Sequence, residues 1–196
     1  MNIIELVINE DEELSGVDAI SVVEEPAIVL DFVALKNQEF KLAEISAEKR
    51  ILMGAALVPD KPIYRTNGEE EFYIYFSKKT VAKASEMFLR KGNQNKATLE
   101  HAEAIGGMTV VESWLVEDNV HDKSRKYGLN VPVGTWMVSM KVYNDEVWNE
   151  YVKTGRVKGF SIEGYFADKL ERPQDKQKDQ LSEEEQIIKK IIDALK

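Results

Sequence analysis

No cysteine occurs among the 196 residues of the chain. This absence excludes disulfide bonds, thiolate zinc sites and a cysteine nucleophile, and it fits a reducing compartment. Histidine is nearly as scarce, with only His101 and His121 in the sequence. Because histidine is the side chain that ordinarily titrates near neutral pH, histidine-based catalysis in this chain must use one of these two residues.

Positive charge is also in short supply, since 26 basic residues face 35 acidic ones and the formal net charge is −9. That sign is wrong for a protein that neutralises phosphates, so we expect no nucleic-acid partner. The acidic runs at residues 11–13 and 69–71 place consecutive carboxylates in turns, where they repel one another and face water. We therefore expect no metal and no cofactor.

Long apolar runs are missing as well. No stretch approaches the roughly 20 apolar residues that a membrane-spanning helix requires. The opening "MNIIELVINEDEEL" carries acids where a secretory signal needs a basic start. These features predict a soluble intracellular protein with no membrane partner.

What the sequence does contain is typical of one compact, mainly β domain. Hydrophobic residues make up 43% and charged residues 31% of the chain. Residues 136–142 alternate apolar and smaller side chains, as in a strand, while Asn67-Gly68 predicts a hairpin turn. Two helices are expected, one capped by Ser77 and a second that ends at Gly155. We predict an α+β domain over residues 1–167, with these helices packed on a sheet or barrel.

The composition changes near residue 168. Residues 168–181 are polar and nearly devoid of large apolar groups, which predicts a solvated linker. Residues 182–196 begin with a capping box, Ser182 and Glu185, and carry an isoleucine-rich stripe. An amphipathic C-terminal helix of this kind needs a partner surface, so we expect it to support docking or self-association.

Ser161 stands in "VKGFSIEGYF", residues 157–166, a segment that otherwise predicts a buried strand. The segment is not a nucleophile elbow, because the spacing after the serine is one residue too long and no helix follows. Isolated serines in strands are usually inert. Ser161 alone therefore does not indicate catalysis, and His101, placed before the Gly106-Gly107 turn, is equally compatible with a structural role. His121 lies in a polar loop, where we expect an exposed residue without a special role.

The order of several segments changes this interpretation. The chain contains, in sequence, "ISVVEEPAI", "GAALVPDKPIYR", "FYIYFSKKTV", "LEHAEAIGGMTVVESWLVED", "GTWMVSMKV" and "VKGFSIEGYF". Together these segments resemble the phage prohead, or capsid-maturation, serine proteases of the XkdF-like kind. The resemblance covers most of residues 15–167. That family is distantly similar to the herpesvirus assemblin-type proteases, which implies a β-barrel wrapped by helices.

The resemblance also implies roles for individual residues. Ser161 would be the nucleophile and His101 its general base. For the group that orients the base we favour Glu112, because it follows the Gly106-Gly107 turn and can lie near His101 across a hairpin. Glu163, which shares the strand face of Ser161, and Asp168, at the end of that strand, remain alternatives. The glycine-containing "TGRVKG" before the serine strand is a candidate source of oxyanion-hole donors.

The implied function is that of a maturation endopeptidase. Its substrates would be phage scaffold protein, extensions of the major capsid protein and the enzyme itself, inside an assembling procapsid in the bacterial cytoplasm. A catalytically silent assembly or scaffolding factor with the same fold is the principal alternative. An unrelated soluble β-domain that binds a small ligand is a third, and a closed, apolar cleft near Ser161 would support it.

Overall fold

The computed structural model describes residues 2–9, 15–24, 33–35, 49–66 and 71–168. The described chain is mainly β, as the sequence predicts, with three four-stranded sheets. The predicted linker 168–181, apart from its first residue, and the predicted helix 182–196 lie outside the described residues. No helix in the described ranges is long and apolar enough to cross a membrane.

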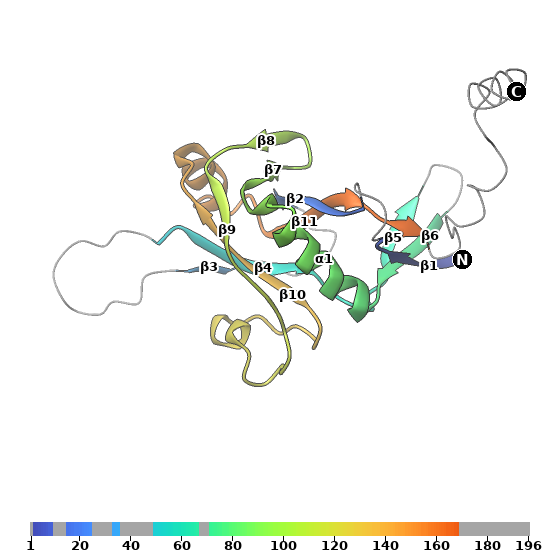
Figure 1. The fold of residues 1–196 in the computed structure, drawn as a ribbon. Coiled ribbons are helices and arrows are strands. Elements are labelled where there is room, and N and C mark those ends of the chain that lie inside the picture. The colour runs from blue at the N-terminus through green and yellow to red at the C-terminus, as the bar shows by residue number, and fades with distance from the viewer. Residues whose placement is uncertain (1, 10–14, 25–32, 36–48, 67–70, 169–196) are drawn as a thin grey trace, which may run out of the picture.

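The first sheet projects to one side of the molecule, on the right of Figure 1. Its strand order is β12-β1-β6-β5. The bounds are β1 (Asn2–Val7), β5 (Ile63–Thr66), β6 (Glu71–Phe76) and β12 (Ala167–Asp168). The predicted hairpin is confirmed, because β5 and β6 pair antiparallel on either side of residues 67–70, which the structure does not describe.

The second and third sheets form the main body. The second has the order β3-β4-β10-β9, with β3 (Val33–Leu35), β4 (Ile51–Leu57), β9 (Met108–Leu115) and β10 (Trp136–Val142). The third has the order β11-β2-β7-β8, with β2 (Gly16–Val23), β7 (Ala97–Leu99), β8 (Glu103–Ile105) and β11 (Gly159–Tyr165). Strand β11 also contacts β4, so these two sheets meet along that line. Within the described residues no continuous ladder closes the sheets into one barrel.

Helix α1 (Lys78–Arg90) crosses in front of these sheets (Figure 1). The Ser77 hydroxyl accepts a hydrogen bond from the Thr80 N–H at 3.4 Å, which confirms the predicted N-cap. The helix buries Phe88 against Trp136, with ring centroids 5.4 Å apart. This edge-to-face contact joins the helix to β10, an inner strand of the second sheet.

Three short helices complete the fold: η1 (Asn93–Asn95), η2 (Lys123–Tyr127) and η3 (Val147–Val152). The last is the second predicted helix, and it has π rather than α geometry. Asn144 accepts a hydrogen bond from the Val147 N–H at 3.1 Å, and Gly155 follows the helix in the left-handed region at φ 71°. The predicted end at Gly155 is therefore present, while the turns before it are wider than in an α-helix.

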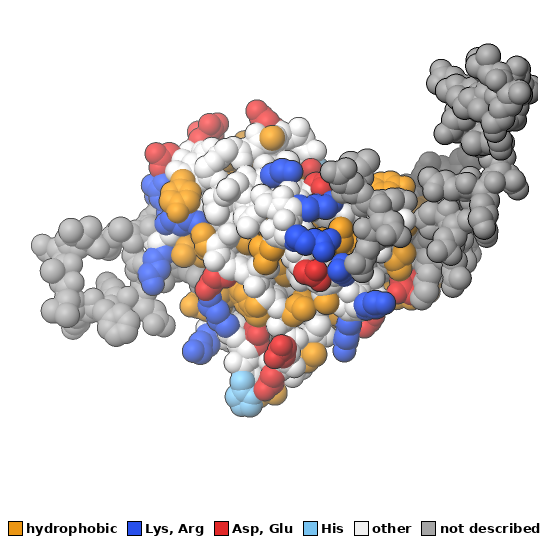
Figure 2. All heavy atoms as spheres, in the orientation of Figure 1, with side chains coloured by type: hydrophobic (Ala, Val, Ile, Leu, Met, Phe, Trp, Pro, Cys, Tyr) orange, Lys and Arg blue, Asp and Glu red, His pale blue; other side chains and the backbone are white. Residues whose placement is uncertain are grey.

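The surface mixes charges of both signs with scattered apolar side chains, and the face drawn in Figure 2 has no large patch of one charge sign.

Within the third sheet, strands β11 and β2 are closely packed. At the irregularity in the β11–β2 ladder, a Cβ on Gly164 would lie 2.8 Å from the Cα of Val17. Only glycine fits this close approach of the two strands.

Candidate active site

His101 lies in the tight turn between β7 and β8. Glu100 and His101 both have positive φ, 51° and 57°, and the Ala102 N–H donates to the Leu99 carbonyl at 3.0 Å. Two successive left-handed residues within such a hydrogen bond define a type I′ turn, which Asn-Gly usually occupies. Here neither position is glycine, and backbone strain of this kind concentrates at functional sites.

Hydrogen bonds between the Ser21 side chain and the backbone hold this turn against β2. The His101 N–H donates to the Ser21 hydroxyl at 3.1 Å, and the Ser21 hydroxyl donates to the Thr98 carbonyl at 3.3 Å. Ser21 is fully buried. One buried side chain therefore ties the end of β7 to the backbone of His101.

Ser161 lies beside this arrangement on β11. It is the ladder partner of Ser21, and its exposed fraction is 8%. Directly paired residues of antiparallel strands have Cα atoms about 5 Å apart and point to the same face. Glu163, two residues further along β11, shares that face.

Glu163 reaches His101. Its Oε1 lies 3.1 Å from the His101 Nδ1, and the Thr98 hydroxyl donates to the same carboxylate oxygen. If Nδ1 carries the proton toward Glu163, Nε2 keeps a lone pair that can accept a proton. A carboxylate in this position can orient the imidazole, which is the part that the acid plays in a catalytic triad.

The third sheet therefore gathers a serine, a histidine and a carboxylate on one side. No hydrogen bond joins His101 to Ser161 within the described residues; Ser21 lies between the two in the sheet. Catalytic hydrogen bonds are often long or poorly aligned without substrate and shorten when it binds.

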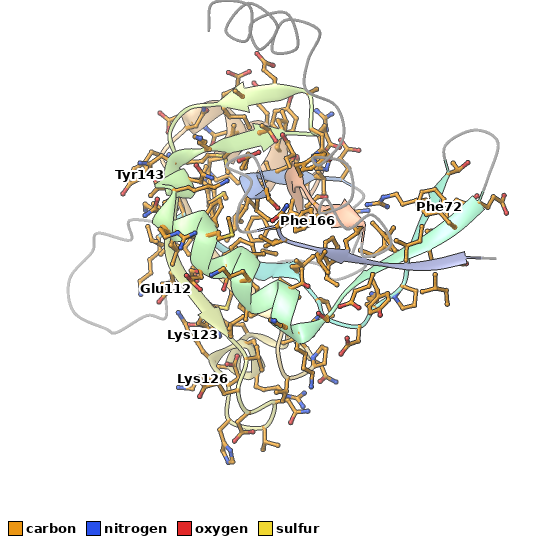
Figure 3. All side chains as sticks on the ribbon, turned by 45° about the vertical axis from the view of Figure 1, so that its right-hand side comes forward. Phe72, Glu112, Lys123, Lys126, Tyr143 and Phe166 are labelled. Carbon is orange, nitrogen blue, oxygen red and sulfur yellow. The ribbon has the colours of Figure 1, made fainter. Side chains whose placement is uncertain are left out.

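Glu112, the orienting acid favoured from the sequence, is placed elsewhere. The expectation of a β8–β9 hairpin is wrong, because β8 pairs with β7 in the third sheet and β9 with β10 in the second. Glu112 accepts hydrogen bonds from Ser139, at 2.5 Å, and from Lys123. Figure 3 shows Glu112 beside Lys123 and away from Phe166, which follows β11.

The electrostatics of Glu112 fit a structural role. Partial burial raises the pKa of its carboxyl, but the hydrogen bonds from Lys123 and Ser139 and the charge of Lys123 outweigh that effect, so the pKa is lowered overall. Lys123 also lies over the Trp114 ring, with its Nζ 5.4 Å from the centroid. These contacts fasten η2 to β9.

The remaining candidates are placed as follows. Asp168 pairs with Leu6 in the first sheet, not in the sheet that carries Ser161. His121 is exposed, as predicted, and its Nδ1 lies 2.7 Å from the Asp118 carboxylate. Hydrogen bonds from His121 and from the Val120 N–H lower the pKa of Asp118.

The residues of the "TGRVKG" segment make structural contacts. Gly155 ends η3, and the Arg156 guanidinium lies 4.7 Å from the Tyr151 ring centroid. Arg156 also binds the Glu24 carboxylate at 3.1 Å. The Lys158 N–H donates to the Val23 carbonyl at 2.8 Å. This amide is therefore already used in the structure and does not provide a free oxyanion donor.

Sequence reasoning missed Ser21 and Thr98. Both are hydroxyl residues in short apolar strands, and a polar side chain in such a strand must find a partner when it is buried. The only advance signal was the serine within "AISVV". Its partner could not be found without the strand order, because 77 positions separate Ser21 from Thr98.

No group of three or more histidine, cysteine, aspartate or glutamate residues in the described part of the chain is arranged to hold a metal ion. Comparison with known proteins gives no relative: no family model, no curated protein and no solved structure matches the chain.

Proposed function

We propose that the chain is a serine endopeptidase in which Ser161 is the nucleophile, His101 the general base and Glu163 the orienting acid. The observation that carries the proposal is the contact between Glu163 and His101 Nδ1 at 3.1 Å, on the sheet face that Ser161 shares. Glu163 takes the role first considered for Glu112, because Glu112 binds Ser139 and Lys123 instead.

The proposed reaction is acyl transfer. His101 Nε2 removes the hydroxyl proton as Ser161 Oγ bonds to the peptide carbonyl carbon, and the imidazolium then gives that proton to the departing amine as the C–N bond breaks. Water next attacks the acyl-enzyme ester, again with His101 as base. This second step releases the carboxylic acid and restores the Ser161 hydroxyl.

The resemblance to phage prohead proteases supports a more specific proposal. The enzyme would cleave scaffold protein, capsid-protein extensions and itself within the assembling procapsid. In that case the second and third sheets, which meet at β4 and β11, correspond to parts of a herpesvirus-protease-like barrel. Self-association through residues 182–196 belongs to the same proposal.

An activity-based probe tests the chemistry independently of any substrate. A fluorophosphonate should add one phosphonyl group to Ser161, with fluoride as the leaving group, and peptide mapping by mass spectrometry would locate it. Ser161→Ala and His101→Ala should remain unmodified. If the folded wild-type protein is not labelled, even when scaffold protein is co-expressed, the catalytically silent assembly factor becomes the better account.

A further inference from the structure

A cavity of about 210 Å³ lies where the first sheet meets β4 and β11. Eight of its eleven lining residues carry apolar side chains. Among the described residues that line it, Arg65 is the one charged residue and Ser161 the one residue that has a hydroxyl group. The side chains around the cavity are therefore mostly apolar, while polar atoms contribute nearly half of its surface. Ligand sites commonly combine apolar walls with a few polar groups.

The cavity is built from strands that are distant in sequence. β1, β4, β5 and β6 supply one side, while Ser161, Ile162 and Phe166 come from β11 and the residue that follows it. Phe166 packs edge-to-face on Phe76, with ring centroids 4.8 Å apart. In Figure 3 Phe166 lies between β11 and the first sheet, whereas Phe72 lies near the start of β6, away from β11.

Size and chemistry restrict what the cavity can hold. Its volume is several times the ~30 Å³ that one water molecule occupies in the liquid. An acidic side chain would find one cationic partner, Arg65, and a basic side chain would find no carboxylate among the described lining residues. Arg65 is exposed and donates to the Tyr64 carbonyl at 2.9 Å. Burying a charge among mostly apolar side chains without a firm partner is costly, so a leucine, methionine or phenylalanine side chain fits better.

We propose that this cavity receives a large apolar side chain of the peptide substrate, from the residue whose carbonyl Ser161 attacks. The inference rests on the proposed function and adds the substrate class to it. Its basis is the position of Ser161. This residue is one of those that line the cavity, and it also lies on the face of the third sheet where Glu163 contacts His101. Placing the apolar side chain in the cavity brings the adjoining carbonyl to the strand that carries the nucleophile.

Amino-acid diphenyl phosphonates test this with the full chain. In these probes Ser161 Oγ bonds to phosphorus, the P–O bond to one phenoxide breaks, and the phenoxide leaves with the proton that His101 has taken. Probes with alanine, leucine, phenylalanine and aspartate side chains differ only in the group offered to the cavity. Since one methylene in an apolar pocket changes specificity by roughly 10–200-fold, leucine and phenylalanine probes should react at least about 10-fold faster than the alanine probe.

Phe166→Ala provides the structural test. It enlarges the cavity and should shift the preference from the leucine probe toward the phenylalanine probe. Phe72→Ala is the matched control, because Phe72 is also a partly buried phenylalanine packed on the core but does not line the cavity. The control should keep the wild-type order of probes. Thermal unfolding of both variants separates a changed preference from lost stability.

The outcomes are distinct for the two proposals. If the fluorophosphonate labels Ser161 but the alanine or aspartate probe reacts as fast as the leucine probe, the cavity assignment is wrong and the peptidase proposal stands. The same conclusion follows if Phe166→Ala and Phe72→Ala give identical probe preferences. If no probe labels Ser161, the proposed function fails, and the cavity assignment fails with it.

Discussion

The turn that carries His101 makes an unusual prediction, namely that glycine at this position is more stable than alanine. Both His101→Ala and His101→Gly remove the imidazole and its contact with Glu163, so they differ only in the Cβ. A residue with a Cβ in the left-handed region costs about 1–2 kcal/mol, and His101 has φ 57°. Glycine costs about 0.5–1 kcal/mol in backbone entropy. The glycine variant should therefore have the larger free energy of unfolding, by about 0.8 kcal/mol, which is the difference between the midpoints of these two ranges.

Urea denaturation of the two variants measures this difference, provided that the slope m is the same for both. Ala104→Gly is the matched control, because Ala104 is exposed on β8 in the same hairpin and has no positive φ. That substitution should destabilise the protein by about 0.5–1 kcal/mol, the opposite sign. A His101→Gly variant that is no more stable than His101→Ala would refute the left-handed turn. Neither variant should be labelled by a fluorophosphonate.

Three further predictions concern the surroundings of the site. The lowered pKa of Glu112 means that its ionised carboxylate stabilises the fold above the ordinary glutamate value near 4.5, and that this stabilisation is lost as pH falls through the folded-state pKa. Glu112→Gln should therefore weaken the fall of unfolding free energy at acid pH, measured by urea titration at several pH values, and an unchanged fall would contradict the lowered pKa. Gly164→Ala should prevent folding or lower the free energy of unfolding by more than about 3 kcal/mol, since its Cβ would meet the β2 backbone. The control Gly106→Ala adds a Cβ with no atom within 4 Å and should leave the melting curve by circular dichroism nearly unchanged, so equal effects of the two substitutions would count against the β11–β2 register. Thr98→Val should keep the fold but slow labelling of Ser161, because Glu163 loses a hydrogen-bond donor; a wild-type labelling rate would show that Thr98 has no part in the site.

Local structure could largely be predicted from the sequence. Ser77 marks the start of α1, and the alternation in residues 136–142 identifies β10. These signals are local, because a cap or a two-residue period depends only on neighbouring positions.

Strand order could not be predicted in the same way. The short Gly106-Gly107 connection favours a hairpin, yet β8 and β9 join different sheets. Parallel pairing of β2 with β7 depends on contacts 77 positions apart, and no local pattern encodes it. For this reason the sequence indicated Ser161 and His101 but favoured Glu112 over Glu163.

The most direct test of the central claim is the second-order rate constant for fluorophosphonate labelling of Ser161 in Glu163→Gln and in Glu112→Gln. If Glu163 orients the general base, Glu163→Gln should reduce the rate constant by a factor on the order of 10²–10⁴, while Glu112→Gln should keep the wild-type value. A normal rate in Glu163→Gln, or a large loss confined to Glu112→Gln, would contradict the arrangement of Ser161, His101 and Glu163 as a catalytic unit.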